Sequence, residues 1–242
     1  ADSRPLAAVE RAALAQPPAR DALAALAPAD RVKIIAEIKR ASPSRGDLAG
    51  IPDPAHQARL YEAGGASAIS VLTEGRRFKG SLDDLTAVRD AVGLPVLRKD
   101  FVATPYQVLE ARAARADLVL LIVAALDRPT LTDLHALIVD LGMTPLVETH
   151  SAAELDIALE LGAKLVGVNA RDLSTFELDR DLFGRLAASI PAGVVKVAES
   201  AVLKPADVAH YRAAGADVVL IGEALVTGDP VATLRAFLEV GS

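Results

Sequence analysis

Short apolar runs alternate with longer amphipathic stretches along most of this chain. From about residue 32 onward, each run is rich in Val, Ile and Leu, and its length and flanking turn residues favour a buried strand over a helix. Between the runs, apolar residues recur at helical spacing. The predicted strands are Val32–Lys39, Ala68–Thr73, Pro95–Phe101, Leu118–Ala124, Thr144–Thr149, Leu165–Asn169, Val194–Glu199 and Val218–Gly222.

Capping residues mark where the intervening helices begin and end. The predicted starts carry an N-cap residue or an early proline, and the predicted ends carry glycine, which tolerates the left-handed backbone of a helix terminus. The starts are Asp53-Pro54, Ser81, Thr104-Pro105, Ser151, Lys204-Pro205 and Asp229-Pro230. The ends are Gly64-Gly65, Gly93, Gly142, Gly162 and Gly215.

Eight alternating strand and helix units predict an α/β fold, a single (β/α)8 TIM barrel over residues 32–242. Residues 1–31 are predicted to form a short N-terminal helical extension, and no linker divides the chain into two domains. The alternative is an open, doubly wound sheet. It would normally have about five or six strands and a G-x-G-x-x-G turn after the first, which this chain lacks.

Charged and amide residues stand at the ends of the predicted strands. Alternate side chains of a strand share a face, so Glu37 and Lys39 point the same way, opposite to Ile34, Ala36 and Ile38. One consistent choice of face gathers seven side chains at the mouth of a barrel, although the sequence does not decide which face points inward. These are Glu37, Lys39, Lys99, Glu148, Asn169, Arg171 and Glu199. A solvated rim of ion pairs explains any one of them, but seven on one rim favour an acid–base site.

A second group of residues is typical of a phosphate site. Ser42 lies in the loop after the first strand, and loops after the seventh and eighth strands often bind phosphate through backbone N–H groups. Ordinary turn chemistry is the alternative for these loops. His56, His135 and His210 fall in predicted helices and are expected at the surface, and a cap or rim role is expected for His150. No pair of His residues, and no His with a carboxylate, has convincing metal-ligand spacing, so no metal site is expected.

Composition narrows the classes of function. Of 242 residues, 52% are hydrophobic and only 3% aromatic, which suits aliphatic helices packed on a parallel sheet. The net charge is −6, with no basic stripe, so no nucleic-acid partner is expected. No apolar run is long enough to span a bilayer, the first residues do not resemble a signal peptide, and there is no cysteine. We therefore expect a cytoplasmic protein without a membrane partner, and a monomer. The first residue is not Met, so we expect processing or trimming.

Several motifs together resemble the indole-3-glycerol phosphate synthase family. The resemblance runs in order from about residue 32 to the end, and the first and third motifs are the most specific. The motifs are Glu37-Ile38-Lys39-Arg40-Ala41-Ser42-Pro43-Ser44-Arg45-Gly46, Ser70-Val71-Leu72-Thr73-Glu74, Leu97-Arg98-Lys99-Asp100-Phe101, Leu120-Leu121-Ile122-Val123, Leu146-Val147-Glu148, Val168-Asn169-Ala170-Arg171-Asp172-Leu173 and Ala198-Glu199-Ser200.

The resemblance implies a carboxy-lyase of tryptophan biosynthesis that uses no cofactor. Its phosphorylated substrate, 1-(2-carboxyphenylamino)-1-deoxyribulose 5-phosphate, closes to indole-3-glycerol phosphate with loss of carbon dioxide and water. By similarity, Lys99 is the general acid for ring closure and Glu148 the general base for dehydration. Lys39 holds the substrate's anionic groups and shares in proton delivery. Which lysine is the principal acid stays open.

The resemblance also assigns supporting and substrate-binding residues. Glu37 and Asn169 orient the reacting groups, and Glu199 supports the charge network. The residues expected to contact polar groups of the substrate are Ser42, Arg171 and Ser200. Those expected to wall the aromatic ring are Phe78, Phe101, Leu120, Leu173 and Leu220. Those expected to bind phosphate through backbone N–H groups are Ala201, Gly222 and Glu223.

Three features differ from the usual family pattern. Ala201 stands where the family has Gly; if that position has φ > 0, alanine costs about 1 kcal/mol. Glu223 stands where many members have Ser, so its carboxylate is expected to point away from a phosphate. The segment before residue 32 is shorter than the family's extension, which helps to cover the mouth, so we expect weaker substrate binding. These changes are compatible with an engineered or weakened member of the family.

Other activities remain as alternatives. Phosphoribosylanthranilate isomerase is another phosphate-binding barrel, but it is expected to use a Cys and an Asp, and this chain has no Cys. An aldolase-type barrel would use a lone lysine as a Schiff-base nucleophile. A catalytically silent barrel acting as a scaffold is the third alternative, against which the retained lysines and glutamates argue.

Overall fold

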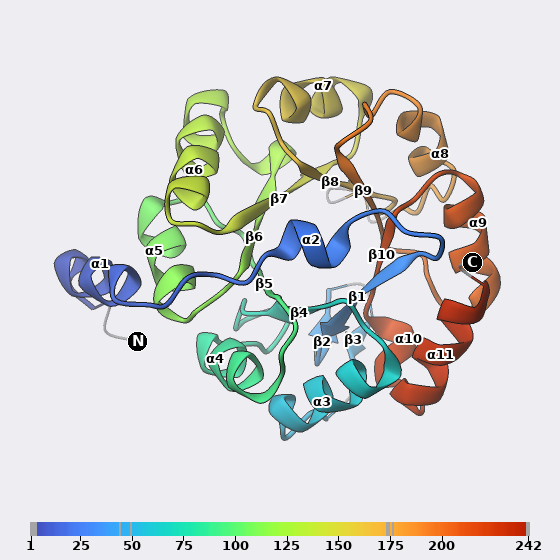
Figure 1. Cartoon of the computed structure of the whole chain (residues 1–242), viewed down its shortest axis with the longest axis horizontal. Coiled ribbons are helices and arrows are strands. Elements are labelled where there is room, and N and C mark those ends of the chain that lie inside the picture. Colours follow the sequence, from blue (N-terminus) through green and yellow to red (C-terminus); the bar gives the residue numbers. More distant parts are fainter. Residues whose placement is uncertain (1–3, 44, 49, 173–174, 176, 241–242) are drawn as a thin grey trace.

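The computed structural model describes residues 4–43, 45–48, 50–172, 175 and 177–240. Within this part of the chain, eight parallel strands close into a barrel in the order β1-β10-β9-β8-β7-β6-β5-β4, and β4 pairs back onto β1 (Figure 1). The strands are β1 (Lys33–Ile38), β4 (Ala68–Leu72), β5 (Val96–Lys99), β6 (Leu118–Ile122), β7 (Thr144–Thr149), β8 (Leu165–Asn169), β9 (Val195–Glu199) and β10 (Val218–Ile221). The predicted (β/α)8 barrel is confirmed. Closure excludes the open sheet.

Each strand is buried on both faces, which the apolar runs predicted. One face packs inside the barrel, where Ile35, Leu97 and Leu146 belong to one cluster. The other face packs against the surrounding helices, and Ile34 and Ala36 lie there. The structure therefore settles the choice of face: the side chains of Glu37 and Lys39 follow Ile35 into the barrel.

A ring of helices surrounds the barrel (Figure 1). It consists of α3 (Pro54–Gly64), α4 (Leu82–Ala91), α5 (Pro105–Ala113), α6 (Arg128–Asp140), α7 (Ala152–Glu160), α8 (Leu182–Ala187), α9 (Pro205–Ala213), α10 (Glu223–Val226) and α11 (Pro230–Val240). The predicted caps form: the Asp53 side chain accepts from the His56 N–H, and Thr104 forms a capping box with Gln107. Gly65, just beyond α3, adopts φ 96°. Gly93 is not left-handed, because α4 ends earlier in an extended Val92.

Two helices precede the barrel, as the sequence predicted for this segment. In Figure 1, α2 (Ala22–Leu26) lies across the barrel, and its Ala22 and Leu26 join the interior cluster. Just before α2, the Arg20 N–H donates to Asp117, directly before β6. Because Asp117 marks the amino end of a strand, α2 closes the end of the barrel opposite the mouth. The mouth therefore gains no cover from α2.

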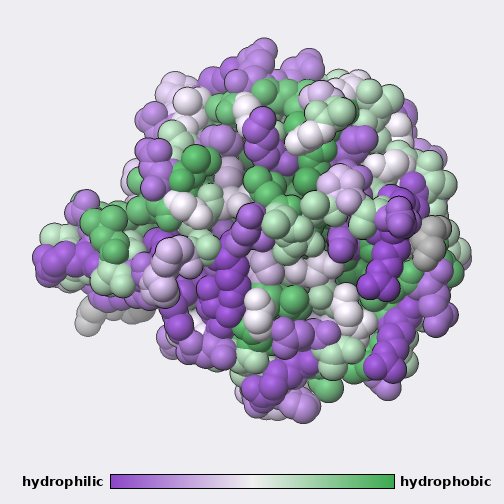
Figure 2. Space-filling view, viewed as in Figure 1, coloured by the Kyte–Doolittle hydropathy of each residue, from purple (hydrophilic) through white to green (hydrophobic). Residues whose placement is uncertain are grey.

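Helix α1 (Leu6–Leu14) lies outside the ring and packs on α5 through Val9, Ala13 and Leu109. It projects at the left edge of Figure 2 with hydrophobic atoms on its surface, and Leu6 and Leu14 are exposed.

The loops after the strands contain short elements that the sequence did not predict. After β1, the strands β2 (Ala41–Ser42) and β3 (Gly46–Asp47) form a small antiparallel hairpin. After β6, Val123–Ala125 forms a 3-10 turn, η1. After β10, the short helix α10 begins at Glu223.

Candidate active site

Four strands bring lysines and glutamates together at the mouth of the barrel. The Nζ of Lys39 lies 2.9 Å from Oε1 of Glu37. The Nζ of Lys99 lies 3.5 Å from Oε2 of Glu37 and 3.5 Å from Oε2 of Glu199. Glu148, from β7, is buried beside them and interacts electrostatically with both Lys99 and Glu199. The convergence predicted from strand parity is confirmed.

Burial and mutual charge set the ionisation of this cluster. Burial alone would raise the pKa of Glu37, but Lys39 and Lys99 outweigh it and lower that pKa to about 2. Burial opposes the charge on Lys99, yet the neighbouring glutamates raise its pKa. The pKa of Glu199 is raised well above its usual value by burial and by Glu148. Three carboxyl groups and two ammonium groups would carry one net negative charge if all were ionised, which is consistent with a raised pKa on one of the carboxyl groups.

Two glycines leave the space that these carboxylates occupy. A Cβ on Gly222 would lie 2.7 Å from Oε1 of Glu37 and 3.3 Å from Nζ of Lys39. A Cβ on Gly167, in β8, would lie 2.1 Å from Oε1 of Glu199. We expected Gly222 to allow close approach of a ligand to the backbone. Its φ is −121°, and what it accommodates within the chain is the glutamate–lysine pair of β1.

Asn169 holds the loop after β9. Its Oδ1 accepts a hydrogen bond from Ser200 Oγ at 2.7 Å and one from the Arg171 N–H at 3.0 Å. Ser200 and Ala201 both have positive φ, at 70° and 59°. The condition under which alanine is costly at position 201 is therefore present, and this loop holds two side-chain-bearing residues in a conformation that favours glycine.

An open cavity of about 430 Å³ lies over the cluster. Most residues predicted for the site line it, namely Glu37, Lys39, Ser42, Phe78, Lys99, Phe101, Asn169, Arg171, Ser200, Ala201, Leu220, Gly222 and Glu223. Glu148, Glu199 and Leu120 are buried in the barrel and do not line it. Leu173 lies outside the described residues.

The cavity is also lined by residues that the sequence did not single out for the site. They are Pro43, Arg45, Arg77, Leu178, Arg180, Val202 and Leu203. All lie on loops, where neither strand parity nor helical periodicity indicates a direction. The one feature of the sequence that could have indicated them is that they follow predicted strands, where the active-site loops of such a barrel lie.

Arg45 and Glu223 form an ion pair between the first and last loops of the barrel. Both side chains line the cavity. The carboxylate of Glu223 thus has a cationic partner, and its expected orientation away from a phosphate stays a prediction.

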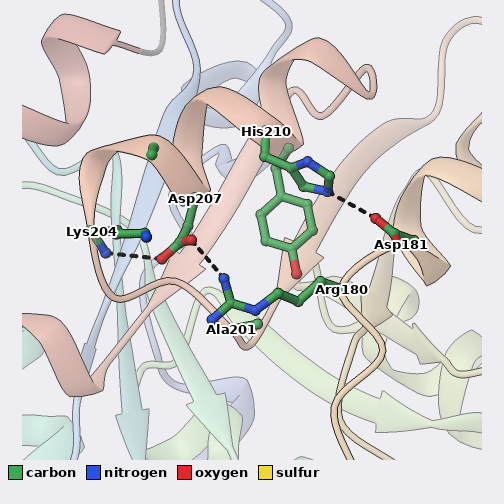
Figure 3. A pocket seen from close by; sticks show the side chains of 8 residues that line it. Arg180, Asp181, Ala201, Lys204, Asp207 and His210 are labelled. Carbon is green, nitrogen blue, oxygen red and sulfur yellow. Dashed lines mark hydrogen bonds and ion pairs between the residues drawn. The ribbon is translucent and has the colours of Figure 1, made fainter.

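A second cavity, of about 310 Å³, lies beside the loop after β9 (Figure 3). Arg180 and Ala201 line both cavities. Figure 3 shows Asp207 between Arg180 and the backbone of Lys204, and His210 directed toward Asp181. Asp207 is buried, and it also accepts from the Leu203 N–H at 2.9 Å. This carboxylate therefore ties the start of α9 to the neighbouring loop.

The four histidines differ in their surroundings. His56 and His210 are exposed, as predicted. His135 is half-buried, because its helix packs on the barrel, so its predicted surface position is wrong. The side chain of His150 is only 9% exposed and lies between Glu148 and Glu154.

Among the described residues, no three His, Asp or Glu side chains are grouped so that they could hold a metal ion. In the same part of the chain, no helix has the length and apolar character needed to cross a membrane.

A barrel whose strand ends bring buried lysines and glutamates beneath an open cavity is typical of a (β/α)8-barrel enzyme that works by acid–base chemistry. A sequence model of the family "Indole-3-glycerol phosphate synthase" matches residues 1–237. The chain belongs to this family.

Curated relatives agree with the family match. An indole-3-glycerol phosphate synthase of Leifsonia xyli subsp. xyli is 75% identical over 237 residues, which is 98% of this chain and 91% of the relative. One from Parafrankia sp. is 62% identical, covering 93% of this chain and 84% of the relative. One from Mycobacteroides abscessus is 57% identical, covering 98% and 87%.

Two solved structures of low sequence identity share the fold alone. An N-acetylmannosamine-6-phosphate 2-epimerase from Clostridium perfringens has a TM-score of 0.66 at 15% identity, covering 88% of this chain and 94% of that structure. A thiamine phosphate pyrophosphorylase from Pyrococcus furiosus has a TM-score of 0.65 at 14% identity, covering 86% and 94%.

Proposed function

We propose that the lysine–glutamate cluster is the active site at which this carboxy-lyase of tryptophan biosynthesis acts. The substrate is 1-(2-carboxyphenylamino)-1-deoxyribulose 5-phosphate, and the product is indole-3-glycerol phosphate. The ring carbon that bears the carboxylate attacks the ketone, carbon dioxide leaves, and water is then eliminated. The reaction needs a proton donor at the ketone oxygen and a base for the final elimination.

Lys99 is the general acid of ring closure in this proposal. Its ammonium faces the cavity and is held by Glu37 and Glu199, each 3.5 Å from its Nζ. The raised pKa of Lys99 keeps it protonated at neutral pH, so it stabilises the oxyanion that develops on the ketone oxygen and delivers a proton to it. This position of Lys99 is the observation that carries the proposal.

Glu148 is the general base of dehydration in this proposal. Glu199, which is coupled to it electrostatically, helps to set the charge of the cluster around Glu148. Burial excludes water from both carboxyl groups. The pKa of Glu199 is raised by burial and by Glu148, which favours its protonated form, so we assign the role of base to Glu148. Since Glu148 does not line the open cavity, we expect it to reach the substrate only when the mouth closes over it.

The substrate's phosphate and aromatic ring contact different cavity residues in this proposal. Lys39, Arg171 and Ser200 line the cavity from the segments after β1, β8 and β9, and Ala201, Gly222 and Glu223 line it from the segments after β9 and β10. We propose that these residues bind the phosphate, the last three through backbone N–H groups. Phe78, Phe101 and Leu220 form the apolar wall for the aromatic ring, where exclusion of water favours loss of carbon dioxide.

The proposal also includes the cellular location and the oligomeric state of the enzyme. We infer a cytoplasmic enzyme, supported by its biosynthetic family and by the absence of cysteine. We also infer a monomer, which sedimentation of the full chain tests directly by its mass.

The assignment of roles is tested by following indole fluorescence with the proposed substrate. We expect Lys99→Ala to abolish turnover, with a loss of at least about 10³-fold, and Glu148→Gln to slow it severely, while circular dichroism shows a folded barrel. Lys196→Ala is the matched control, because Lys196 lies on β9 with the parity opposite to Glu199. Unchanged rates in Lys99→Ala and Glu148→Gln would refute the roles proposed here.

A further inference from the structure

His150 lies between two carboxylates directly after β7. Its Nε2 is 3.5 Å from Oε1 of Glu148, and its Nδ1 is 3.4 Å from Oε2 of Glu154. Both ring nitrogens are buried and without a hydrogen bond among the described residues, and so is that oxygen of Glu148. These distances are slightly longer than an ordinary hydrogen bond. The side chains of Glu148, His150 and Glu154 therefore lie in a row. Small movements would bring each ring nitrogen of His150 within hydrogen-bond distance of the carboxylate beside it.

The outer end of this row is fixed by the start of α7. Glu154 lies in the first turn of that helix, and its Oε2 accepts the backbone N–H of His150 at 2.8 Å. Its own N–H donates to Ser151 Oγ at 3.2 Å. This reciprocal capping holds the Glu154 carboxylate in one place. The imidazole of His150 therefore has a fixed carboxylate 3.4 Å from its Nδ1.

We propose that His150 is a positioning residue that orients the carboxylate of Glu148 for proton abstraction. Imidazole nitrogens can donate to one or both carboxylates, so His150 can connect a fixed capping residue to Glu148. Glu148 also interacts electrostatically with Glu199, on β9, and with Lys99, on β5. Neither of these strands pairs with β7, whereas His150 follows β7 directly and its Nε2 lies 3.5 Å from Oε1 of Glu148.

The orientation of a catalytic carboxylate such as that of Glu148 has a large effect on the rate. Displacing a catalytic group by about 1 Å can lower a rate about 100-fold. Hydrogen bonds to catalytic groups are often long in the free enzyme and shorten when substrate binds. The 3.5 Å separation between His150 and Glu148 is therefore compatible with a bond that forms in the working complex. The inference rests on the proposed role of Glu148 as the base.

A double-mutant cycle tests the inference, with kcat and KM measured by indole fluorescence. We expect His150→Leu, which removes the donor, to lower kcat about 10- to 50-fold with less than a twofold change in KM. His150→Gln keeps a donor and should recover part of that loss. In a Glu148→Gln background, measured in single turnover with excess enzyme, His150→Leu should slow the reaction less than twofold further, because its effect passes through Glu148.

The outcomes separate the two proposals. If Glu148→Gln leaves kcat unchanged, the role of Glu148 fails. If Glu148→Gln slows the reaction but His150→Leu does not, or if their losses multiply, the role of His150 fails. Equal loss in His150→Gln and His150→Leu would also overturn it. Nuclear magnetic resonance of ¹⁵N-labelled histidine gives a readout independent of activity: Glu148→Gln should shift the ring nitrogens of His150 and leave those of His56 unchanged.

Discussion

Buried carboxyl groups at the two ends of the barrel differ in how many hydrogen bonds they accept. At the amino end, Asp117 is fully buried, and its two oxygens accept from the N–H groups of Arg20 and Val96 at 2.7 and 2.9 Å and from the Arg89 guanidinium at 3.2 Å. At the carboxyl end, both oxygens of Glu199 are buried without a hydrogen bond to any described residue. A charge whose bonds are satisfied stabilises the fold. The carboxyl group of Glu199, which lacks such bonds, interacts instead with Lys99 and Glu148 of the candidate site.

The largest expected effect tests the satisfied end. Asp117→Ala leaves two backbone N–H groups and a guanidinium without their acceptor, so we expect the free energy of unfolding to fall by about 3–5 kcal/mol. Asp117→Asn keeps one acceptor and should lose roughly half as much. Urea denaturation gives both values. The kcat per folded molecule should stay unchanged, and a lower kcat in folded Asp117→Asn would break the contrast between the two ends.

Glu199→Gln tests the unsatisfied end. Because the pKa of Glu199 is raised well above its usual value, a neutral amide should cost little stability, and urea denaturation should show a change below about 1 kcal/mol. Its pairing with Lys99 and its coupling to Glu148 are lost, so we expect kcat to fall about 100-fold. A variant with normal kcat, or one that is strongly destabilised, would show that Glu199 has a structural role like that of Asp117.

Gly167→Ala displaces Glu199 without changing its chemistry. The new methyl group would lie 2.1 Å from Oε1, so the carboxyl group must move away from Lys99. We expect kcat to fall about 10-fold with a small change in melting temperature. Gly184→Ala is the matched control, because a Cβ there would meet its nearest atom, on Ala214, at an ordinary 3.5 Å. Equal activity of the two variants would show that the position of Glu199 does not matter.

The smallest effect concerns the loop after β9. Ala201→Gly relieves a left-handed backbone, and the gain of roughly 1 kcal/mol is partly offset by the greater freedom of glycine in the unfolded chain. We expect tighter binding of inorganic phosphate in calorimetry. Arg115→Gly, at φ 66° and remote from the mouth, controls for backbone relief away from the site, and Arg115→Ala accounts for the loss of its ion pair with Asp90. Weaker phosphate binding in Ala201→Gly would contradict a phosphate site at this loop.

The barrel could be predicted from the sequence because each of its units repeats a local signal. Strand runs, N-caps and terminal glycines all depend on neighbours in the chain, and strand parity then grouped Glu37, Lys99 and Glu148 correctly. The choice between the two faces could not be made, because both faces are apolar and only the helices outside distinguish them. The roles of these residues stay predictions.

Contacts between segments that are distant in the chain could not be predicted from the sequence. The link from Arg20 to Asp117 joins residues 97 positions apart, and no periodicity indicates it. The space that Gly167 and Gly222 leave for carboxylates depends on side chains from other strands. The arginines around the cavity lie on loops, whose directions follow from the assembled barrel. Local patterns thus predicted the scaffold, whereas the detailed environment of each charge required the three-dimensional structure.

The pairing of β1 with β10 joins the first strand of the barrel to the last. Arg45 and Glu223, on the loops that follow these two strands, are 178 positions apart. During synthesis on the ribosome, the first lysine–glutamate pair therefore emerges long before the strand that completes its surroundings. The growing polypeptide cannot assemble a complete mouth until its final segment is released, so premature termination removes activity even when most of the barrel has been made.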